Sequence, residues 1–257
     1  MMEDKMIFLL GGHDLEMLTI LDILKSRGIA YRDKMLQWDN ALLSQYKQEL
    51  DLHAGDSSWM IYGIELQEDM VAPDNYMRID HHNDYAKKES SLQQVAAILN
   101  YPLNRYQQLV AANDSGYIPE MYRAGATELE TIQIRLADRK AQGITFEEEM
   151  QAEKAIDEGM RSLDDGLIIV KACSSRFSPI CDRLFPYKQL LIHTDHECVF
   201  YGKGASKLAA IYRTEISNRR CFYGGGEQGY FGTAADAFSP EELTRIIHHI
   251  ISIHNDL

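Results

Sequence analysis

The tripeptide Asp80-His81-His82 places a carboxylate beside two imidazoles at the end of a predicted strand, residues 76–79. Carboxylate oxygens with some imidazole suit Mn²⁺ or Mg²⁺ better than a thiolate site would. The simpler interpretation is a solvated loop with two ordinary histidines. The surrounding sequence favours a metal site.

Further acidic and histidine side chains stand just beyond other predicted strands or helices: His13, Asp14, Glu16, Glu65 and Asp114. Loops beyond the carboxyl ends of parallel strands open into one crevice, so side chains on such loops can meet. Each acid taken singly is more typical of a cap or a solvated turn; the prediction depends on the set. Two divalent ions held there, with Asp80 bridging both, can clamp the attacking and leaving oxygens of a phosphoryl displacement.

The elements that would position these residues alternate between strand and helix. Short apolar runs predict strands at 6–10, 59–64 and 76–79, and helical spacing of leucines predicts a helix that ends at Gly28. A Ser91–Gln94 capping box predicts the start of another helix. This alternation predicts an α/β fold, a parallel sheet with helices on both faces.

A length of 257 residues suits two domains better than one. Residues 1–124 carry the acidic and histidine set. Residues 125–163 have helical periodicity without a strand signal, which predicts a helical connector. Residues 164–257 contain further apolar runs, at 166–170, 189–192 and 198–201, and predict a smaller α/β domain.

The amino-acid composition limits which partners this protein is expected to bind. The net charge is -13, which argues against broad non-specific binding of nucleic acid and leaves a small anionic phosphorylated substrate as the expected partner. No apolar run approaches the ~20 residues that span a bilayer. The N-terminus does not resemble a signal peptide, and four irregularly spaced cysteines predict reduced thiols, so we expect a cytoplasmic protein. A homodimer is left open.

The ordered motifs resemble the DHH phosphoesterase superfamily along nearly the whole chain. The resemblance implies a catalytic DHH domain, a smaller substrate-binding domain, and a divalent metal site. It further implies that Asp80, His81 and Asp114 are metal ligands, that His82 faces the phosphate, and that His13, Asp14 and Glu16 occupy the family's first motif. Glu65 stands where that family usually has an aspartate.

The glycine run Gly224-Gly225-Gly226 predicts an anion site lined by backbone N–H groups, and Arg220 just upstream is the guanidinium we expect to bind phosphate. A flexible turn and a solvated basic face are the simpler interpretations. The family commonly has a histidine after these glycines, where this chain has Glu227. Nearby aromatic residues can stack on a base or belong to the core: Tyr223, Tyr230 and Phe231.

The leading hypothesis is a metal-dependent hydrolase of a small phosphorylated nucleotide or short oligonucleotide. The first alternative is a sensor that binds nucleotide with a weakened metal site, and the second is a pyrophosphatase-like enzyme. The segment 193–198 could supply a zinc site, but polar residues between two predicted strands are more typical of a hairpin turn.

Overall fold

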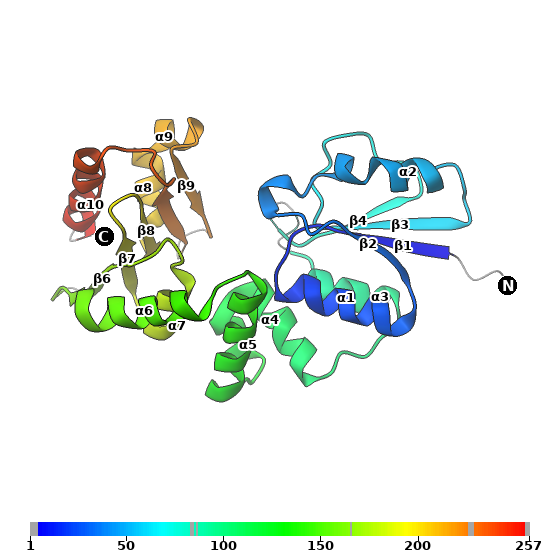
Figure 1. The fold of residues 1–257 in the computed structure, drawn as a ribbon, viewed down its shortest axis with the longest axis horizontal. Helices are drawn as coiled ribbons and strands as arrows, with labels where there is room; N and C mark the ends of the chain where they lie inside the picture. The colour runs from blue at the N-terminus through cyan, green and yellow to red at the C-terminus, as the bar shows by residue number, and fades with distance from the viewer. Residues whose placement is uncertain (1–4, 83–84, 86, 165, 226–228, 255–257) are drawn as a thin grey trace. The chain divides into compact units, whose positions relative to one another are not determined.

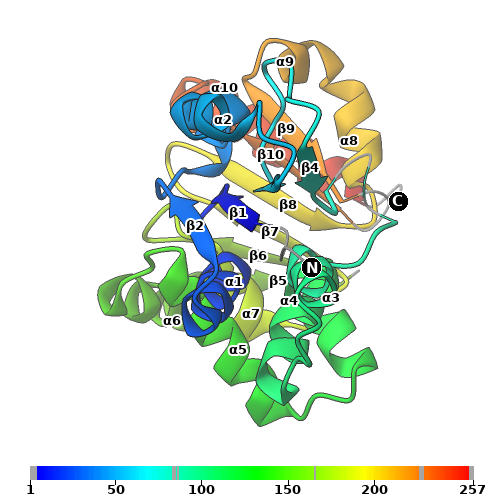
Figure 2. The ribbon, with the colours of Figure 1, turned by 90° about the vertical axis from the view of Figure 1, so that its right-hand side faces the viewer.

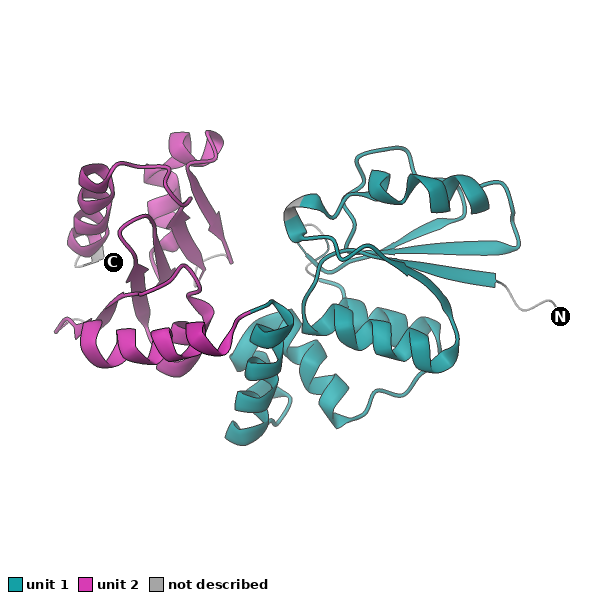
Figure 3. Ribbon diagram, viewed as in Figure 1, with its two compact units in different colours: residues 1–143 teal, residues 144–257 magenta. Residues whose placement is uncertain are grey.

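The computed structural model describes residues 5–82, 85, 87–164, 166–225 and 229–254. The chain divides into two compact units, residues 1–143 and 144–257 (Figure 3). This boundary falls inside the predicted connector, 125–163. Helix α5 (Glu128–Ala141) packs against α1 and α4 of unit 1, whereas α6 (Phe146–Gly159) packs against β6 and α7 of unit 2.

Unit 1 is built on a parallel sheet with strand order β2-β1-β3-β4 among its described residues. Its strands are β1 (Lys5–Leu10), β2 (Ala30–Asp33), β3 (Trp59–Ile64) and β4 (Tyr76–Ile79). Its helices are α1 (Leu15–Arg27), α2 (Lys47–His53), α3 (Ser91–Ile98), α4 (Arg105–Arg123) and α5, with 3₁₀ turns η1 (Trp38–Asn40) and η2 (Leu43–Tyr46).

Helices cover both faces of this sheet, with α2 on one face and α1 and α3 on the other (Figures 1 and 2). The central strand β1 is buried from Ile7 to Leu10, which explains its continuous apolar run. Below α2, a core cluster joins Ile7 and Leu9 to Tyr46 and Leu50. The predicted fold class, α/β with a parallel sheet, is confirmed.

Helix α3 begins one residue earlier than the capping box in the sequence predicts. Ser90 is the N-cap, and its side chain and that of Gln93 form the reciprocal box. Because the cap lies at Ser90, the predicted cap residue Ser91 becomes the first helical residue and its hydroxyl is free to contact another element.

Gly11 lies where the ends of β1 and β3 approach closely. A Cβ at this position would lie 2.7 Å from the carbonyl oxygens of both Ile64 and Glu65. We therefore expect Gly11→Ala to lower the free energy of unfolding by roughly 1–3 kcal/mol, the usual cost of overpacking, as measured by urea denaturation. Gly55→Ala is the matched control, because nothing lies within 4 Å of a Cβ there. Equal losses in the two variants would contradict the prediction.

Unit 2 contains a mixed sheet, with strand order β5-β6-β7-β8-β10-β9 among its described residues. Its strands are β5 (Met160–Ser162), β6 (Leu167–Lys171), β7 (Gln189–His193), β8 (Cys198–Gly202), β9 (Cys221–Gly224) and β10 (Tyr230–Thr233). Besides α6, its helices are α7 (Ser178–Leu184), α8 (Ala205–Ile211), α9 (Arg213–Ser217) and α10 (Pro240–His254). Strands β6 and β7 are parallel, and the other neighbours are antiparallel.

The two faces of this sheet have separate cores. Leu191, Phe200 and Phe231 pack on the side of α8 and α10, while Leu190 and Val199 pack on the side of α6 and α7. Alternation along β7 and β8 explains this division, since successive side chains point to opposite faces. The four cysteines are free, as predicted. Among the described residues, every helix is too short or too polar to cross a membrane.

Candidate metal centre

Four side chains converge in unit 1. Glu65, His81, His82 and Asp114 each present one ligand atom, and these atoms all lie within 4.8 Å of one another. Glu65 follows β3, and the two histidines follow β4, so the carboxyl ends of neighbouring parallel strands supply three of the four. Asp114 comes from α4, just before that helix departs from helical geometry at Gly116 and Tyr117.

The backbone of Glu65 has a positive φ of 52°, a conformation that costs a non-glycine residue ~1–3 kcal/mol. Its N–H donates to the Ile79 carbonyl, and the Ser91 hydroxyl donates to Glu65 Oε1 at 2.7 Å. These contacts hold the carboxylate in the cluster. Positive φ at a non-glycine residue occurs often at functional sites, where the surrounding fold compensates for the strain.

Glu16 approaches the same cluster from the first turn of α1. The Leu92 N–H donates to Glu16 Oε1 at 2.9 Å, and Glu16 Oε2 lies 3.7 Å from His81 Nε2. Asp14 is the N-cap of α1, and its Oδ1 accepts from the Met17 N–H at 2.9 Å. Both acids are buried, so the first predicted motif contributes two carboxylates to this region.

Three buried atoms in the cluster have no well-aligned hydrogen-bond partner among the described residues: Glu16 Oε2, His81 Nε2 and Asp114 Oδ2. His81 Nε2 contacts Asp114 Oδ2 and lies 3.5 Å from Glu65 Oε1. Buried polar atoms normally find partners, and unsatisfied ones point to an ion or a water. Carboxylate oxygens with imidazole nitrogen are suitable ligands for Mn²⁺ or Mg²⁺, so the residues present fit a divalent cation.

Protonation in the metal-free cluster reflects crowded negative charge. Burial, together with the charges of Asp114 and Glu65, raises the pKa of Asp14 to about 7 and raises that of Glu16 well above its usual range. Burial lowers the pKa of the His81 imidazole, but its contacts with Asp114 and Glu65 outweigh burial and raise that pKa to about 10. Protonated His81 is therefore the counter-ion of the carboxylates at neutral pH.

Asp80 is not one of the four converging residues, but its Oδ1 lies 3.4 Å from His82 Nδ1, so it contacts the cluster through His82. Burial raises its pKa, but contacts with His82 and Arg78 outweigh burial and lower it. Arg78 Nε donates to Asp80 Oδ2 at 3.0 Å, and the His82 N–H donates to Oδ1 at 2.8 Å. The contact with Asp80 raises the pKa of His82 despite burial. The bridging role of Asp80 stays a prediction.

His13 lies in the loop between β1 and α1, partly exposed, and the structure does not place it in the converging set of described residues. Three contacts escaped the sequence analysis: Ser91 with Glu65, Arg78 with Asp80, and Trp38 near His82. The Trp38 ring lies 5.5 Å from the His82 ring and would contact a Cβ at Gly12. Trp38 begins η1 and is 49% exposed, and no pattern in the sequence connects it to His82.

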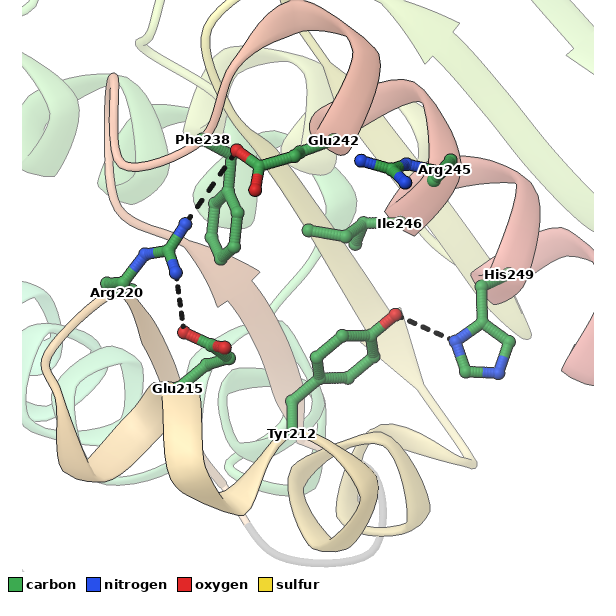
Figure 4. Close-up of a pocket in the computed structure, with 8 residues that line it drawn as sticks. All are labelled: Tyr212, Glu215, Arg220, Phe238, Glu242, Arg245, Ile246 and His249. Carbon is green, nitrogen blue, oxygen red and sulfur yellow. Dashed lines mark hydrogen bonds and ion pairs between the residues drawn. The ribbon is translucent and has the colours of Figure 1, made fainter.

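Arg220, the predicted phosphate ligand, lies in a pocket of unit 2 where its donors are engaged (Figure 4). It donates to the Ala237 carbonyl and to Glu215 Oε2, and its guanidinium lies over the Phe238 ring at 4.0 Å. The pocket is lined by Tyr212, Glu215, Arg220, Phe238, Glu242, Arg245, Ile246 and His249. These contacts give Arg220 a structural role, and its role toward substrate stays a prediction.

The structure describes part of the anion site predicted at Gly224-Gly225-Gly226. Gly224 ends β9, Gly225 has a positive φ of 77°, and Gly226 lies outside the described residues, as does Glu227. Its binding of an anion stays a prediction.

The segment 193–198 forms the hairpin turn between β7 and β8. The Thr194 hydroxyl accepts from the His196 and Glu197 N–H groups, and Asp195 pairs with Lys171. Within the described residues, this segment gathers no set of three metal-ligand atoms. The predicted hairpin turn is confirmed.

Comparison with known proteins links this architecture to solved structures. No family model matches the sequence, and no curated protein matches it. The DHH domain of a member of a ribosomal-protein family aligns with a TM-score of 0.54 at 12% identity, over 95% of this chain and 85% of its own.

Two further structures align more loosely. An exopolyphosphatase-related protein from Bacteroides fragilis has a TM-score of 0.47 and 13% identity, over 98% of this chain and 93% of its own. RecJ from Thermus thermophilus, in complex with Mn²⁺, also has a TM-score of 0.47 at 10% identity, and this chain spans 52% of it. From the first alignment and the sheet topology, this chain has the fold of DHH-domain proteins.

Proposed function

We propose that this chain is a metal-dependent phosphoesterase that hydrolyses a small phosphorylated nucleotide or a short oligonucleotide. The observation that carries the proposal is the convergence of Glu65, His81, His82 and Asp114 within 4.8 Å. Three buried atoms of this region also lack a well-aligned hydrogen-bond partner among the described residues. Such an arrangement is costly unless a cation joins it, because buried like charges repel one another and buried polar atoms need partners.

Glu65, His81 and Asp114 would hold divalent cations, with Glu16 and Asp14 adding carboxylates from α1. We infer a pair of ions, because two divalent ions can clamp both the attacking and the leaving oxygen of a phosphoryl displacement. When bound, such ions lower the pKa of a coordinated water and offset the charge of a phosphoryl group.

His82 would contact the substrate. Its side chain is 41% exposed, whereas that of His81 is 7% exposed, so His82 can reach a ligand from solvent. Contact with Asp80 raises the pKa of His82, which favours the imidazolium form that attracts a phosphate oxygen. Arg78 holds Asp80, and through it positions His82.

Purified protein with Mn²⁺ is expected to release phosphate or mononucleotide from at least one member of a panel of mononucleotides, dinucleotides, short oligonucleotides and pyrophosphate. Asp114→Asn should lower that rate roughly a hundredfold or more, since even residues behind metal ligands change activity ~10–100-fold. Asp51→Asn is the matched control, because Asp51 is exposed and pairs with Lys47. Equal rates for both variants would refute the site.

Asp80→Asn tests the remaining predicted ligand in the same assay. Loss of hydrolysis together with loss of Mn²⁺ affinity would support a bridging role. Loss of hydrolysis with unchanged Mn²⁺ affinity would assign Asp80 to positioning His82.

A sensor remains the second candidate, because Glu16 and Glu65 stand where aspartates are expected and Asp80 pairs with Arg78. Calorimetry separates the two functions. Saturable nucleotide binding with no turnover under Mn²⁺ or Mg²⁺ would favour the sensor over the hydrolase.

A further inference from the structure

Helix α4 is kinked immediately after Asp114, one of the four converging residues of the candidate metal centre. Gly116 has φ −168° and ψ 26°, and Tyr117 has φ 60° and ψ −151°, so helical geometry is interrupted over two residues. A positive φ is uncommon for a bulky aromatic residue, and such strain persists only where neighbouring contacts hold the backbone in place. The position of the Asp114 carboxylate therefore depends on the contacts that fix this segment.

The Arg135 side chain of α5 contacts this segment both before and after Asp114. Its Nη1 donates to Asn113 Oδ1 at 2.9 Å, and its guanidinium lies over the Tyr117 ring, 4.6 Å from the ring centre. Arg135 and Asn113 are both buried. A planar guanidinium can donate several hydrogen bonds and stack on an aromatic ring at the same time, which a lysine ammonium cannot do. One buried side chain thus contacts the residue before Asp114 and the residue three positions after it.

Asp138, about one turn further along α5, joins the same guanidinium to the start of α1. Arg135 Nη1 donates to Asp138 Oδ2 at 2.7 Å, and the Leu15 N–H donates to Asp138 Oδ1 at 3.4 Å. The first N–H groups of a helix lack partners within that helix, so a buried carboxylate is favourable beside them. Leu15 stands between Asp14 and Glu16, the two acids that α1 adds to the metal centre. The Arg135–Asp138 pair therefore links α4 and α1, the two helices that supply acids.

The stability of the fold gives little reason for an ion pair at this place. The side chains of Arg135 and Asp138 are only 9% and 7% exposed. The cost of taking two charges out of water can exceed their mutual attraction, and well-packed apolar residues often replace such a pair without loss of stability. Asp138 is also outside the group of ligand atoms that converge among the described residues. Fixing the geometry of neighbouring ligands is a role that an apolar pair could not fill.

We propose that Arg135 and Asp138 are positioning residues, which set where Asp114 lies relative to the acids of α1 and so determine how tightly the centre binds a divalent cation. Replacing side chains that orient metal ligands typically weakens metal binding ~10–100-fold. Helix α5, which the sequence predicts as part of a connector, thereby belongs to the scaffold of the metal centre. The inference rests on the proposed function, because it requires that the centre binds metal.

Arg135→Lys tests this role, because it keeps the positive charge and removes the planar group of donors. Calorimetric titration of full-length protein with Mn²⁺ is expected to show an affinity ~10–100-fold weaker than that of wild type. Arg105→Lys is the matched control, since Arg105 also joins α4 to α5, through a solvent-exposed ion pair with Glu130 at 3.0 Å. Wild-type affinity in Arg135→Lys, or equal losses in the two variants, would overturn the proposal.

Two variants of Asn113 separate positioning from a merely structural role. Asn113→Ala removes the oxygen that accepts from Arg135, whereas Asn113→Asp keeps an acceptor at the same place. The affinity for Mn²⁺ should fall in Asn113→Ala and be restored at least to the wild-type value in Asn113→Asp. Urea denaturation in EDTA shows that each variant is folded under the conditions of the titration. An equal loss of affinity in both folded variants would count against the contact with Arg135.

Metal binding and hydrolysis, measured on the same proteins, distinguish failure of this inference from failure of the proposed function. Binding of Mn²⁺ that depends on Arg135, with no hydrolysis of any member of the substrate panel, would support the positioning role and reject the hydrolase. Hydrolysis by wild type, with Mn²⁺ affinity and rate both unchanged in Arg135→Lys, would retain the hydrolase and reject the positioning role.

Discussion

His81→Ala is expected to destabilise the metal-free protein at pH 7 by about 3 kcal/mol or more. The imidazole is buried among Glu16, Glu65 and Asp114, and contact with carboxylates raises its pKa to about 10. It is therefore a cation at neutral pH, and its removal leaves buried carboxylates without a counter-ion. Breaking a buried ion pair by removing one partner typically costs ~3–5 kcal/mol. Urea denaturation in EDTA measures the loss.

The same variant should also bind Mn²⁺ more weakly, so metal would restore little of the lost stability. In wild type, saturating metal adds ~4 kcal/mol at a concentration about 1,000 times the dissociation constant. His248→Ala is the matched control, because His248 is an exposed histidine of α10. If His81→Ala in EDTA proved as stable as wild type, His81 would not be the counter-ion of this cluster.

Wild-type protein without metal is expected to lose stability as pH rises from about 4 to 10, opposite to the usual behaviour of surface carboxylates. Burial raises the pKa of Asp14 from 3.8 to about 7. A group with a raised folded-state pKa stabilises the fold below its unfolded pKa and loses that contribution as pH rises through the folded value. Ionisation of Asp14 therefore lowers the free energy of unfolding as pH rises from about 4 to 7. The decrease is on the order of 4 kcal/mol at most.

His81 extends this loss to higher pH, since its pKa rises from 6.5 to about 10. Asp80 has a lowered pKa and stabilises the fold above pH 3.8, so it offsets the trend only in more acidic solution. Metal ligands must be deprotonated to bind, so Mn²⁺ affinity should increase with pH while metal-free stability falls. Thermal melting in EDTA and in Mn²⁺, from about pH 5 to 9, should give curves that diverge as pH increases. Parallel curves would contradict the linkage.

Glu16→Gln tests whether the Glu16 carboxyl is one of the groups whose loss of a proton lowers stability as pH rises. Burial, with the charges of Asp114 and Glu65, raises the pKa of Glu16 well above its usual range, so the amide closely resembles the protonated acid. Its carbonyl can still accept from the Leu92 N–H. We expect unchanged stability in EDTA at neutral pH, a shallower loss at higher pH, and weaker Mn²⁺ binding. Glu158→Gln, an exposed acid paired with Lys154, should match wild type in all three measurements.

The order of strands and helices in unit 1 could be predicted from sequence wherever apolar runs are continuous. Strand β3 has the predicted bounds, Trp59–Ile64, because a central parallel strand is buried on both sides and its sequence shows this directly. The edge strand β2 was missed. Ala30–Asp33 alternates between exposed and partly buried residues, and its pairing with β1 makes it a strand.

The residue types of the candidate metal centre could likewise be predicted, because Glu65, His81 and His82 follow strands whose carboxyl ends share one edge of the sheet. Which atoms meet was decided by tertiary structure. Asp80 contacts both Arg78 and His82, whereas Asp114 reaches the cluster from inside α4, a position that no local pattern connects to β4. Side-chain direction after a strand depends on neighbouring charges and on backbone strain, as at Glu65.

In unit 2, strand pairing alone places Phe222 of β9 and Tyr230 of β10 on one face of the sheet. Phe222, Tyr230 and two glycines are ordinary strand residues in the sequence, and register across three strands brings the rings onto one face. Sequence therefore determined the residue types and the periodic elements, which are local properties. Long-range register, burial and charge determined which side chains became a site, because these depend on residues far apart in the chain.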